Sequence, residues 1–532
     1  MSAPLMGRGR VLWHLMRADF LERLRRYSFL VTLAATVWLG YLVGTGKLGI
    51  WVGEARGVFN SAWIGTTMAM VINTFLSLAG FYVVKGSVDR DRQTGVGQIL
   101  ATTPMTKPLY ALGKAASNCA VLAAMVGVLA VAAVVIQLTM AEDSHVHVAT
   151  LLLPFVFLSL PVMALVSAAA VLFETVPFLR RGFGNVVWFF AWTGVMAMGI
   201  PDKSGHARFQ DAFGLGPVFR NITAAYRQAF HKEPVGFILG GIEHSEKTGR
   251  FVWQGMDWTA ATLTGRLVWT LLAIGVALVA ALLFDRFDPS RGGLRRQSAP
   301  NTSNGGAVDA AGQPAAAPVP HVTLTPVAAG AMRFRFPTIL VAELKLALKG
   351  QRWWWWAGAA GTFIGTLAAP LDAVKQIALP LAWIWPILIW SPLGTRESRF
   401  DTGGLLFSAP RPLLRQLPAT WAAGVVLAML TGSGAALHFL VKGDLAGVGA
   451  WLVGALFIPT FALALGVWSG TSKLFEILYL VIWYIGPMNH VPEMDYLGST
   501  QKGLAQGMPV VYLAITALLA TAAVAGRKRQ LG

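Results

Sequence analysis

The residues with the strongest chemical character lie in one polar stretch, residues 85–114, between two long apolar segments. It reads KGSVDRDRQTGVGQILATTPMTKPLYALGK and contains four consecutive charged residues: Asp89, Arg90, Asp91 and Arg92. Charges at this density cannot lie in hydrocarbon, so the stretch must leave the membrane that its apolar neighbours would occupy. A partial copy of the stretch occurs near residue 400.

A Gly-Lys pair in this stretch raises the question of nucleotide binding. A phosphate-binding loop needs an upstream glycine-rich turn and a Gly-Lys-Ser/Thr ending, whose amides and ammonium group bind phosphates. Gly46-Lys47 is followed by leucine and Gly113-Lys114 by alanine, and neither pair has the required glycine upstream. The chain is therefore not expected to bind ATP through this motif.

Residue types that bind metals cluster once, at Glu142, Asp143, His145 and His147. A His-x-His pair beside carboxylates can coordinate a metal ion, but the His-Glu-x-x-His spacing of a zinc protease is missing. We interpret the cluster as a hydrated polar turn and predict no metal site. The single cysteine, Cys119, excludes a disulfide within the chain.

Charged residues deep in the membrane would indicate ion-coupled transport. Asp, Glu, Lys and Arg are nearly absent from the middle of the apolar runs. Glu174 lies instead near Arg180 and Arg181, at the end of a run. Energy is therefore expected to enter from a partner, through the polar stretches.

Apolar helices must position these stretches. Of the 532 residues, 55% are hydrophobic and 13% charged, and apolar runs of about 20 residues match a bilayer core about 30 Å thick. We predict an all-α polytopic membrane protein with about twelve transmembrane helices and cytosolic N- and C-termini. The net charge of +18 reflects the excess of Lys and Arg on the cytosolic side of such proteins, so no nucleic-acid partner is expected.

The predicted spans form two groups of six, each preceded by a basic interfacial helix, at residues 8–26 and 339–352. The first group is residues 28–43, 63–84, 115–140, 148–173, 186–200 and 263–284. The second group begins at Trp353 and continues with residues 377–392, 421–441, 451–468, 474–485 and 510–525. Residues 1–285 thus form one half and residues 335–532 the other. The Pro-, Ala- and Gly-rich residues 286–334 form a disordered cytosolic linker.

The two halves carry matching motifs, which predict two parallel six-helix repeats. The first polar stretch has Arg90-Asp91, Thr94-Gly95, Leu100 and Pro104. The second, residues 394–416, has Arg396-Glu397, Arg399, Thr402-Gly403, Leu406 and Pro410. A weaker match lies in the predicted outer loops, between Asp211 with Gly214 and Asp495 with Gly498.

The first stretch resembles the coupling segment of permease subunits of the type-2 ABC exporter class. The resemblance is carried by DRDRxTG at residues 89–95, by Leu100-x-x-x-Pro104 and by Tyr110-x-x-Gly113-Lys114. In that family the segment between the second and third spans forms a coupling helix that docks into a cleft of the ATPase subunit. The resemblance implies that both stretches couple to an ATPase, although the second lacks the Gly-Lys ending and has QLP at residues 416–418.

The resemblance also implies that the chain is not an enzyme and holds no cofactor. ATP and Mg would be bound by a cytosolic ABC ATPase subunit, present in two copies. We expect an exporter in the bacterial cytoplasmic (inner) membrane, in contact with membrane lipids, with an amphipathic, lipid-like, peptide or drug substrate. Two alternatives remain open: a secondary transporter with parallel repeats, and a membrane scaffold of an enzyme-maturation complex.

Overall fold

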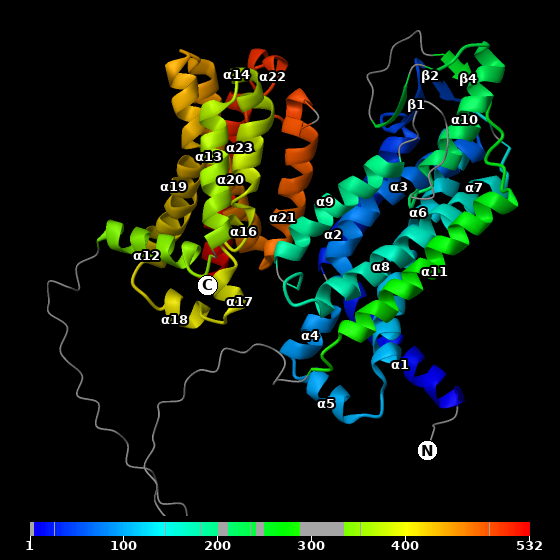
Figure 1. The fold of residues 1–532 in the computed structure, drawn as a ribbon, viewed down its shortest axis with the longest axis horizontal. Helices are drawn as coiled ribbons and strands as arrows, with labels where there is room; N and C mark the ends of the chain where they lie inside the picture. The colour runs from blue at the N-terminus through cyan, green and yellow to red at the C-terminus, as the bar shows by residue number, and fades with distance from the viewer. Residues whose placement is uncertain are drawn as a thin grey trace, which may run out of the picture. The chain divides into compact units, whose positions relative to one another are not determined.

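The computed structural model describes residues 5–25, 27–143, 145–180, 182–199, 211–234, 236–240, 249–287, 335–351, 353–488 and 490–531. These residues are predominantly helical and divide into two compact units, Met1–Gly292 and Gly293–Gly532 (Figure 1). Each unit buries its own set of apolar side chains. The predicted linker, residues 286–334, lies outside the described residues except at its first two positions.

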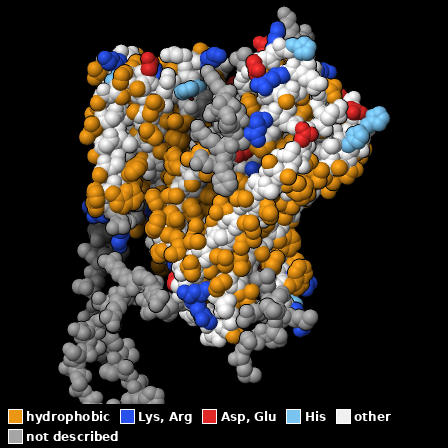
Figure 2. Space-filling view, turned by 45° about the vertical axis from the view of Figure 1, so that its right-hand side comes forward, with side chains coloured by type: hydrophobic (Ala, Val, Ile, Leu, Met, Phe, Trp, Pro, Cys, Tyr) orange, Lys and Arg blue, Asp and Glu red, His pale blue; other side chains and the backbone are white. Residues whose placement is uncertain are grey.

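Seven helical segments are long and apolar enough to cross a membrane. They are Ser61–Gln93, Lys107–Met140, Val148–Thr175, Ala260–Leu283, Pro412–Val441, Leu445–Ser469 and Met508–Leu531. Figure 2 shows hydrophobic side chains covering the helices along their length, with Lys and Arg gathered near their ends. The chain is therefore a helical, multi-pass membrane protein. Within the described residues, the other predicted spans are shorter or interrupted helices.

The first unit contains eleven α-helices and four short strands in its described residues. The helices are α1 (Leu5–Leu24), α2 (Tyr27–Gly44), α3 (Ser61–Val84), α4 (Ser87–Gln93), α5 (Val96–Thr102), α6 (Lys107–Met140), α7 (Val148–Pro154), α8 (Leu160–Thr175), α9 (Gly182–Gly199), α10 (Leu215–Phe230) and α11 (Ala260–Leu283). One π-helical turn, Phe155–Ser159, joins α7 to α8, so that the two form one continuous span.

Helix α3 is the centre of this unit, because almost all of its residues are buried. It packs against α2, α6, α7 and α8. Its buried polar side chains bind other helices: Asn73 donates to the carbonyl oxygen of Phe213 at 3.3 Å, and Ser77 Oγ accepts from Trp192 Nε1 at 2.8 Å. These hydrogen bonds satisfy polar groups that would otherwise be costly to bury.

A small sheet, which the all-α prediction missed, lies at one end of the first unit. Strands β1 (Gly49–Val52), β2 (Ala55–Gly57), β3 (Phe237–Gly240) and β4 (Gly249–Phe251) are ordered β3-β1-β2-β4. The β2–β4 pair is parallel and the other pairs are antiparallel. Glu142 holds the sheet to α6, since its carboxylate lies 2.8 Å from Arg56 and 3.0 Å from Arg250. The strands are too short and too distant in sequence to give a periodic signal.

The second unit contains twelve described α-helices. They are α12 (Phe336–Leu348), α13 (Trp353–Ala368), α14 (Leu371–Ala373), α15 (Leu379–Ile384), α16 (Ile387–Trp390), α17 (Arg396–Arg399), α18 (Gly403–Phe407), α19 (Pro412–Val441), α20 (Leu445–Ser469), α21 (Ser472–Trp483), α22 (Gln501–Ala505) and α23 (Met508–Leu531). Two π-helical turns, Val374–Ala378 and Tyr484–Met488, precede α15 and follow α21, and a 3₁₀ turn spans Pro492–Met494.

The predicted eighth span, residues 377–392, is broken into short pieces. Pro380, Pro386 and Pro392 lie within it, and proline lacks the N–H that continues a helix. The pieces are held by tryptophan side chains instead. Trp383 and Trp390 are buried, and their Nε1 atoms donate to carbonyl oxygens of α19 at 2.9 and 3.1 Å.

The two units use the same helix pairings. Helix α1 packs on α6, α6 on α8, and α8 on α11. In the second unit α12 packs on α19, α19 on α20, and α20 on α23. Each chain of contacts runs from the predicted interfacial helix to the last helix of the unit, as internal repeats would require.

A buried aspartate organises the backbone before a helix in each unit. Asp211 accepts hydrogen bonds from the backbone of Gly214 and the next two residues, at 2.8, 3.0 and 2.7 Å. Asp495 binds the backbone N–H groups of Ser499 and Thr500 at 3.1 and 2.7 Å. Gly214 and Gly498 are both left-handed, with φ of 79° and 65°. In both predicted outer motifs, a buried carboxylate therefore accepts several backbone N–H groups of the tight turn that leads into a helix.

We expect Asp211→Ala and Asp495→Ala each to lower the free energy of unfolding by about 1–2 kcal/mol, because the backbone N–H groups lose their acceptor. The measurement is the thermal unfolding midpoint of the full chain in detergent, which should fall by about 2–5 °C.

Asp257→Ala is the matched control, because Asp257 is exposed and receives one side-chain hydrogen bond, from Asn221. Its midpoint should stay close to that of the unmodified chain. If Asp211→Ala and Asp495→Ala behaved like this control, the two aspartates would not stabilise these turns as described.

Candidate functional site

The first polar stretch folds into α4 and α5, and a carboxylate from α8 holds the start of α4. Glu174 is buried. Its Oε1 accepts from the backbone N–H groups of Gly86 and Ser87 at 2.7 and 3.1 Å, and its Oε2 from those of Val88 and Asp89 at 2.6 and 2.9 Å. The first N–H groups of a helix have no partner within the helix and carry partial positive charge, so this carboxylate stabilises them. Glu174 thus attaches α4 to α8.

The charged side chains of α4 bind other helices of the unit. Lys114 Nζ, on α6, lies 2.8 Å from Asp91 Oδ2 and 2.8 Å from Asp19 Oδ2 of α1. The Tyr110 hydroxyl also donates to Asp91, at 2.7 Å, and Arg90 lies 2.9 Å from Asp19. The Lys114 side chain is only 1% exposed, so it needs both carboxylates as partners. This network ties α4 to α1 and α6.

Two more ion pairs complete the attachment of α4. Arg90 also pairs with Glu22 of α1. Arg92 lies 2.6 Å from Asp285, just beyond α11, and Asp285 also lies 3.6 Å from Arg180. All four charged residues of α4 therefore make contacts within the chain. Arg90, Asp91 and Arg92 form ion pairs, and each of them is at least partly buried.

The residues after α11 cross over α5. Arg286 donates to the carbonyl oxygens of Ala101 and Thr103 at 3.3 and 3.1 Å. The Phe287 ring lies against Gly97, where a Cβ atom would come within 2.5 Å of the ring. Only glycine fits at that position without movement of the ring, so residues 285–287 and α5 are closely packed.

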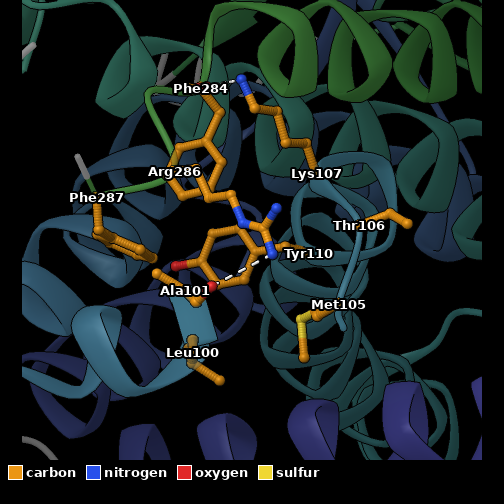
Figure 3. A pocket seen from close by; sticks show the side chains of 9 residues that line it. All are labelled: Leu100, Ala101, Met105, Thr106, Lys107, Tyr110, Phe284, Arg286 and Phe287. Carbon is orange, nitrogen blue, oxygen red and sulfur yellow. Dashed lines mark hydrogen bonds between the residues drawn. The ribbon is translucent and has the colours of Figure 1, made fainter. Parts of the chain in front are cut away.

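A small pocket lies between this crossing and α6 (Figure 3). The Phe284 ring stacks on Tyr110 with centroids 4.9 Å apart, and Lys107 Nζ donates to the Phe284 carbonyl oxygen at 2.7 Å. Leu100 packs against the same apolar cluster. The inner face of α5 is therefore occupied by the chain itself.

The outer face of α5 is exposed and partly apolar. Ile99 is 68% exposed and Val96 is 43% exposed. Gln98 and Pro104 are exposed beside them. These exposed side chains are available to a partner, as are the exposed polar residues Gln93, Thr94 and Thr102, whereas the neighbouring charged side chains hold the stretch in place.

The second polar stretch, α17 and α18, has a similar arrangement. Arg396 lies 3.0 Å from Glu343 of α12. Glu397 is buried, accepts a hydrogen bond from Gln416 at 3.1 Å, and lies 3.3 Å from Arg527 of α23. The outer face of α18 is again apolar, with Leu405 and Leu406 exposed.

The two stretches match without a gap. At constant spacing, the structural counterparts in the first and second stretch are Arg90 and Arg396, Asp91 and Glu397, Gly97 and Gly403, Leu100 and Leu406, Pro104 and Pro410, and Tyr110 and Gln416. Gly95 and Asp401 both have left-handed backbones, with φ of 74° and 51°. Thr402-Gly403 is therefore not the counterpart of Thr94-Gly95, as the order of the motifs had suggested.

The other predicted coupling residues have local roles. The Thr94 hydroxyl donates to the Arg90 carbonyl oxygen at 3.0 Å, and Gly113 is buried within α6. In the second stretch, Arg399 is exposed and its guanidinium lies over the Phe400 ring. These positions neither require nor exclude a partner.

Sequence reasoning missed five charged residues that hold the two stretches: Asp19, Glu22, Glu174, Glu343 and Arg527. Four of them are acids in or next to basic segments, which is a detectable signal. An acid on an interfacial helix that is otherwise basic would find cations in the adjacent polar stretch. Arg527 has no such signal, because it is one of three consecutive basic residues at positions 527–529 and nothing in the sequence distinguishes it from the other two.

No family model, curated protein or solved structure matches this chain. The class that the fold defines is that of a multi-pass helical membrane protein with two similar units.

We expect Glu174→Ala to release α4, because four backbone N–H groups lose their only charged acceptor. The estimated cost is about 2–4 kcal/mol. Trypsin cleavage of the full chain after Arg90 and Arg92, followed by mass spectrometry, should be markedly faster. The cleavage rate of Glu174→Gln should lie between those of the unmodified chain and of Glu174→Ala, since an amide oxygen can still accept hydrogen bonds.

Glu22→Ala is the control, since it removes a half-exposed carboxylate from the same network and should cost no more than about 1 kcal/mol. Equal cleavage in the Glu174→Ala variant and in this control would contradict the anchoring role of Glu174.

Proposed function

We propose that this chain is the membrane-spanning permease subunit of an ATP-driven exporter of the type-2 ABC class. The observation that carries the proposal is the construction of the two polar stretches. Each presents a short helix with an exposed apolar face, α5 or α18, on a base that is fixed to the helices of its unit by buried ion pairs. A cytosolic ATPase that bound these faces could move the helices behind them.

The attachments give such a force a path into the membrane. In the first unit, α4 is joined to α8 by Glu174, to α1 by Arg90 and to α6 by Asp91. Residues 285–287 join α5 to α11. A displacement of α5 would therefore act on four helices together, since packed helices and buried ion pairs resist independent movement.

The proposal includes a topology of twelve spans with both termini in the cytosol. Besides the seven long segments, α2, α9, α13, α21 and the broken helix α15–α16 would complete six spans in each unit. Helices shorter than a bilayer are compatible with such a role where neighbouring helices bury their ends. Both polar stretches then lie on the side of the ATPase.

The proposed substrate is amphipathic or lipid-like, or a hydrophobic peptide or drug, because the long helices are apolar along their length. ATP and Mg would be bound by two copies of the ATPase. The inner membrane of a bacterium is the proposed location, and lipids would cover the exposed apolar helix faces.

We expect Ile99→Glu and Leu405→Glu to weaken binding of the cytosolic ATPase at least tenfold each, because a charge would replace a central apolar contact. The measurement is co-purification and stimulated ATP hydrolysis with an ABC ATPase from the same organism that co-purifies with the unmodified chain. Thermal unfolding should be unchanged, since both side chains are exposed.

Leu445→Glu is the matched control, as Leu445 is also exposed but lies at the start of α20, away from the polar stretches. Unimpaired coupling in a variant carrying both Ile99→Glu and Leu405→Glu would reject the docking role. Transport driven by a proton gradient in vesicles without ATP would reject the exporter class.

The topology is tested by cysteine labelling. After Cys119→Ser, single cysteines at Ile99→Cys and Leu405→Cys should react with a membrane-impermeant maleimide in inverted vesicles, and not in intact cells. A cysteine at Leu445→Cys should show the opposite pattern. Labelling of Ile99→Cys in intact cells would place the first polar stretch outside and refute the proposal.

A further inference from the structure

The two polar stretches are held by similar ion pairs, each set built around two acids and two cations. In the first unit Lys114 joins the two acids and Arg90 also binds a third acid, Glu22; in the second unit the four side chains form two separate pairs. In the first unit the members are Asp19, Arg90, Asp91 and Lys114. In the second unit they are Glu343, Arg396, Glu397 and Arg527.

Three of the four members have the same origin in both units. One acid comes from the first helix of the unit, α1 or α12, and an adjacent Arg-acid pair comes from the polar stretch. The next contact is also shared, because Tyr110 and Gln416 both lie six residues after the matched proline and both donate to the buried acid.

The fourth member differs in origin. In the matched register, Lys114 of α6 corresponds to Thr420 of α19. Thr420 has no charge to offer, and its hydroxyl makes a side-chain hydrogen bond with Glu343. The cation comes from the last helix instead, since Arg527 of α23 lies 3.3 Å from Glu397.

Arg527 is buried at this position and has several contacts there. Its side chain is 4% exposed and that of Glu397 is 8% exposed, so both charges are nearly removed from solvent. Arg527 also donates to Gln530 at 3.0 Å, and its guanidinium lies 5.0 Å from the centre of the Phe407 ring of α18. Its neighbour Lys528 is exposed. A guanidinium buried at this depth requires a carboxylate partner, and Glu397 requires a cation.

We propose that Arg527 is a positioning residue for α17 and α18, and that it supplies from α23 the charge that Lys114 supplies from α6 in the first unit. This positioning role concerns contacts within the chain, so it does not depend on the proposed function. The second stretch is thus tied to its last helix by a buried residue of that helix, whereas the first is tied to its last helix only through residues 285–287, which follow α11. Movement of α18 would therefore be passed directly to α23.

The test removes the cation at Arg527 and places a new one at Thr420, the counterpart of Lys114 in the second unit. Arg527→Gln should speed trypsin cleavage after Arg399 about tenfold or more, because the buried Glu397 loses its cation. Cleavage after Arg90, in the first unit, should not change. Thr420→Lys in the same chain should restore protection.

The same Thr420→Lys substitution in the otherwise unmodified chain should not increase protection and should reduce it, since a third cation would then face two acids. If Thr420→Lys protects the stretch only when Arg527 has been replaced, it acts by supplying the missing cation and not by stabilising the chain in general. Lys528→Gln removes an exposed charge from the same turn of α23 and should leave both stretches as protected as before.

The proposal is overturned if Arg527→Gln leaves the second stretch protected, or if Thr420→Lys has the same effect in both backgrounds. If Arg527→Gln does not fold, Glu397→Gln combined with Arg527→Gln replaces it. That pair lacks an unpaired buried charge and should recover folded protein; failure to recover it would equally overturn the proposal. The assay needs no ATPase, so it does not depend on whether the chain is an exporter.

Discussion

A charge removed from water must be paired, and this requirement determines where both polar stretches lie. Asp91 and Glu397 are buried at the ends of apolar helices, where an unpaired carboxylate would be strongly unfavourable. Each is paired with a cation, and each neighbouring arginine is paired with an acid of the first helix of its unit. Short helices that could not be stable alone are thereby held in one orientation.

The two units share a packing scheme but differ in several local features. The helix pairings are repeated, and so are the buried aspartates of the predicted outer loops. Among the described residues, the small sheet belongs to the first unit alone. The helix that ends each unit also differs, since α11 stops before the polar stretch and crosses it with residues 285–287, whereas α23 continues as a helix past Arg527. Similar scaffolds thus support non-equivalent surfaces.

Sequence periodicity predicted the long helices well, because a run of about 20 apolar residues has few other stable arrangements. Helices α2, α3 and α11 begin and end close to the predicted positions. The predicted eighth span failed because three prolines interrupt it, which an apolar count does not register. The sequence marked both polar stretches, whose role as a coupling site stays a prediction, but their contacts with Asp19, Glu174 and Arg527 depend on tertiary packing. Local composition can mark an acid within a basic segment, but it does not show which distant residue that acid binds.

The turn between the two short helices differs between the units in one residue. Gly95 and Asp401 occupy the same left-handed position. Glycine has a broad range of backbone angles there, whereas aspartate is confined to a narrow basin. The turn between α4 and α5 can therefore change its backbone angles more easily than the turn between α17 and α18.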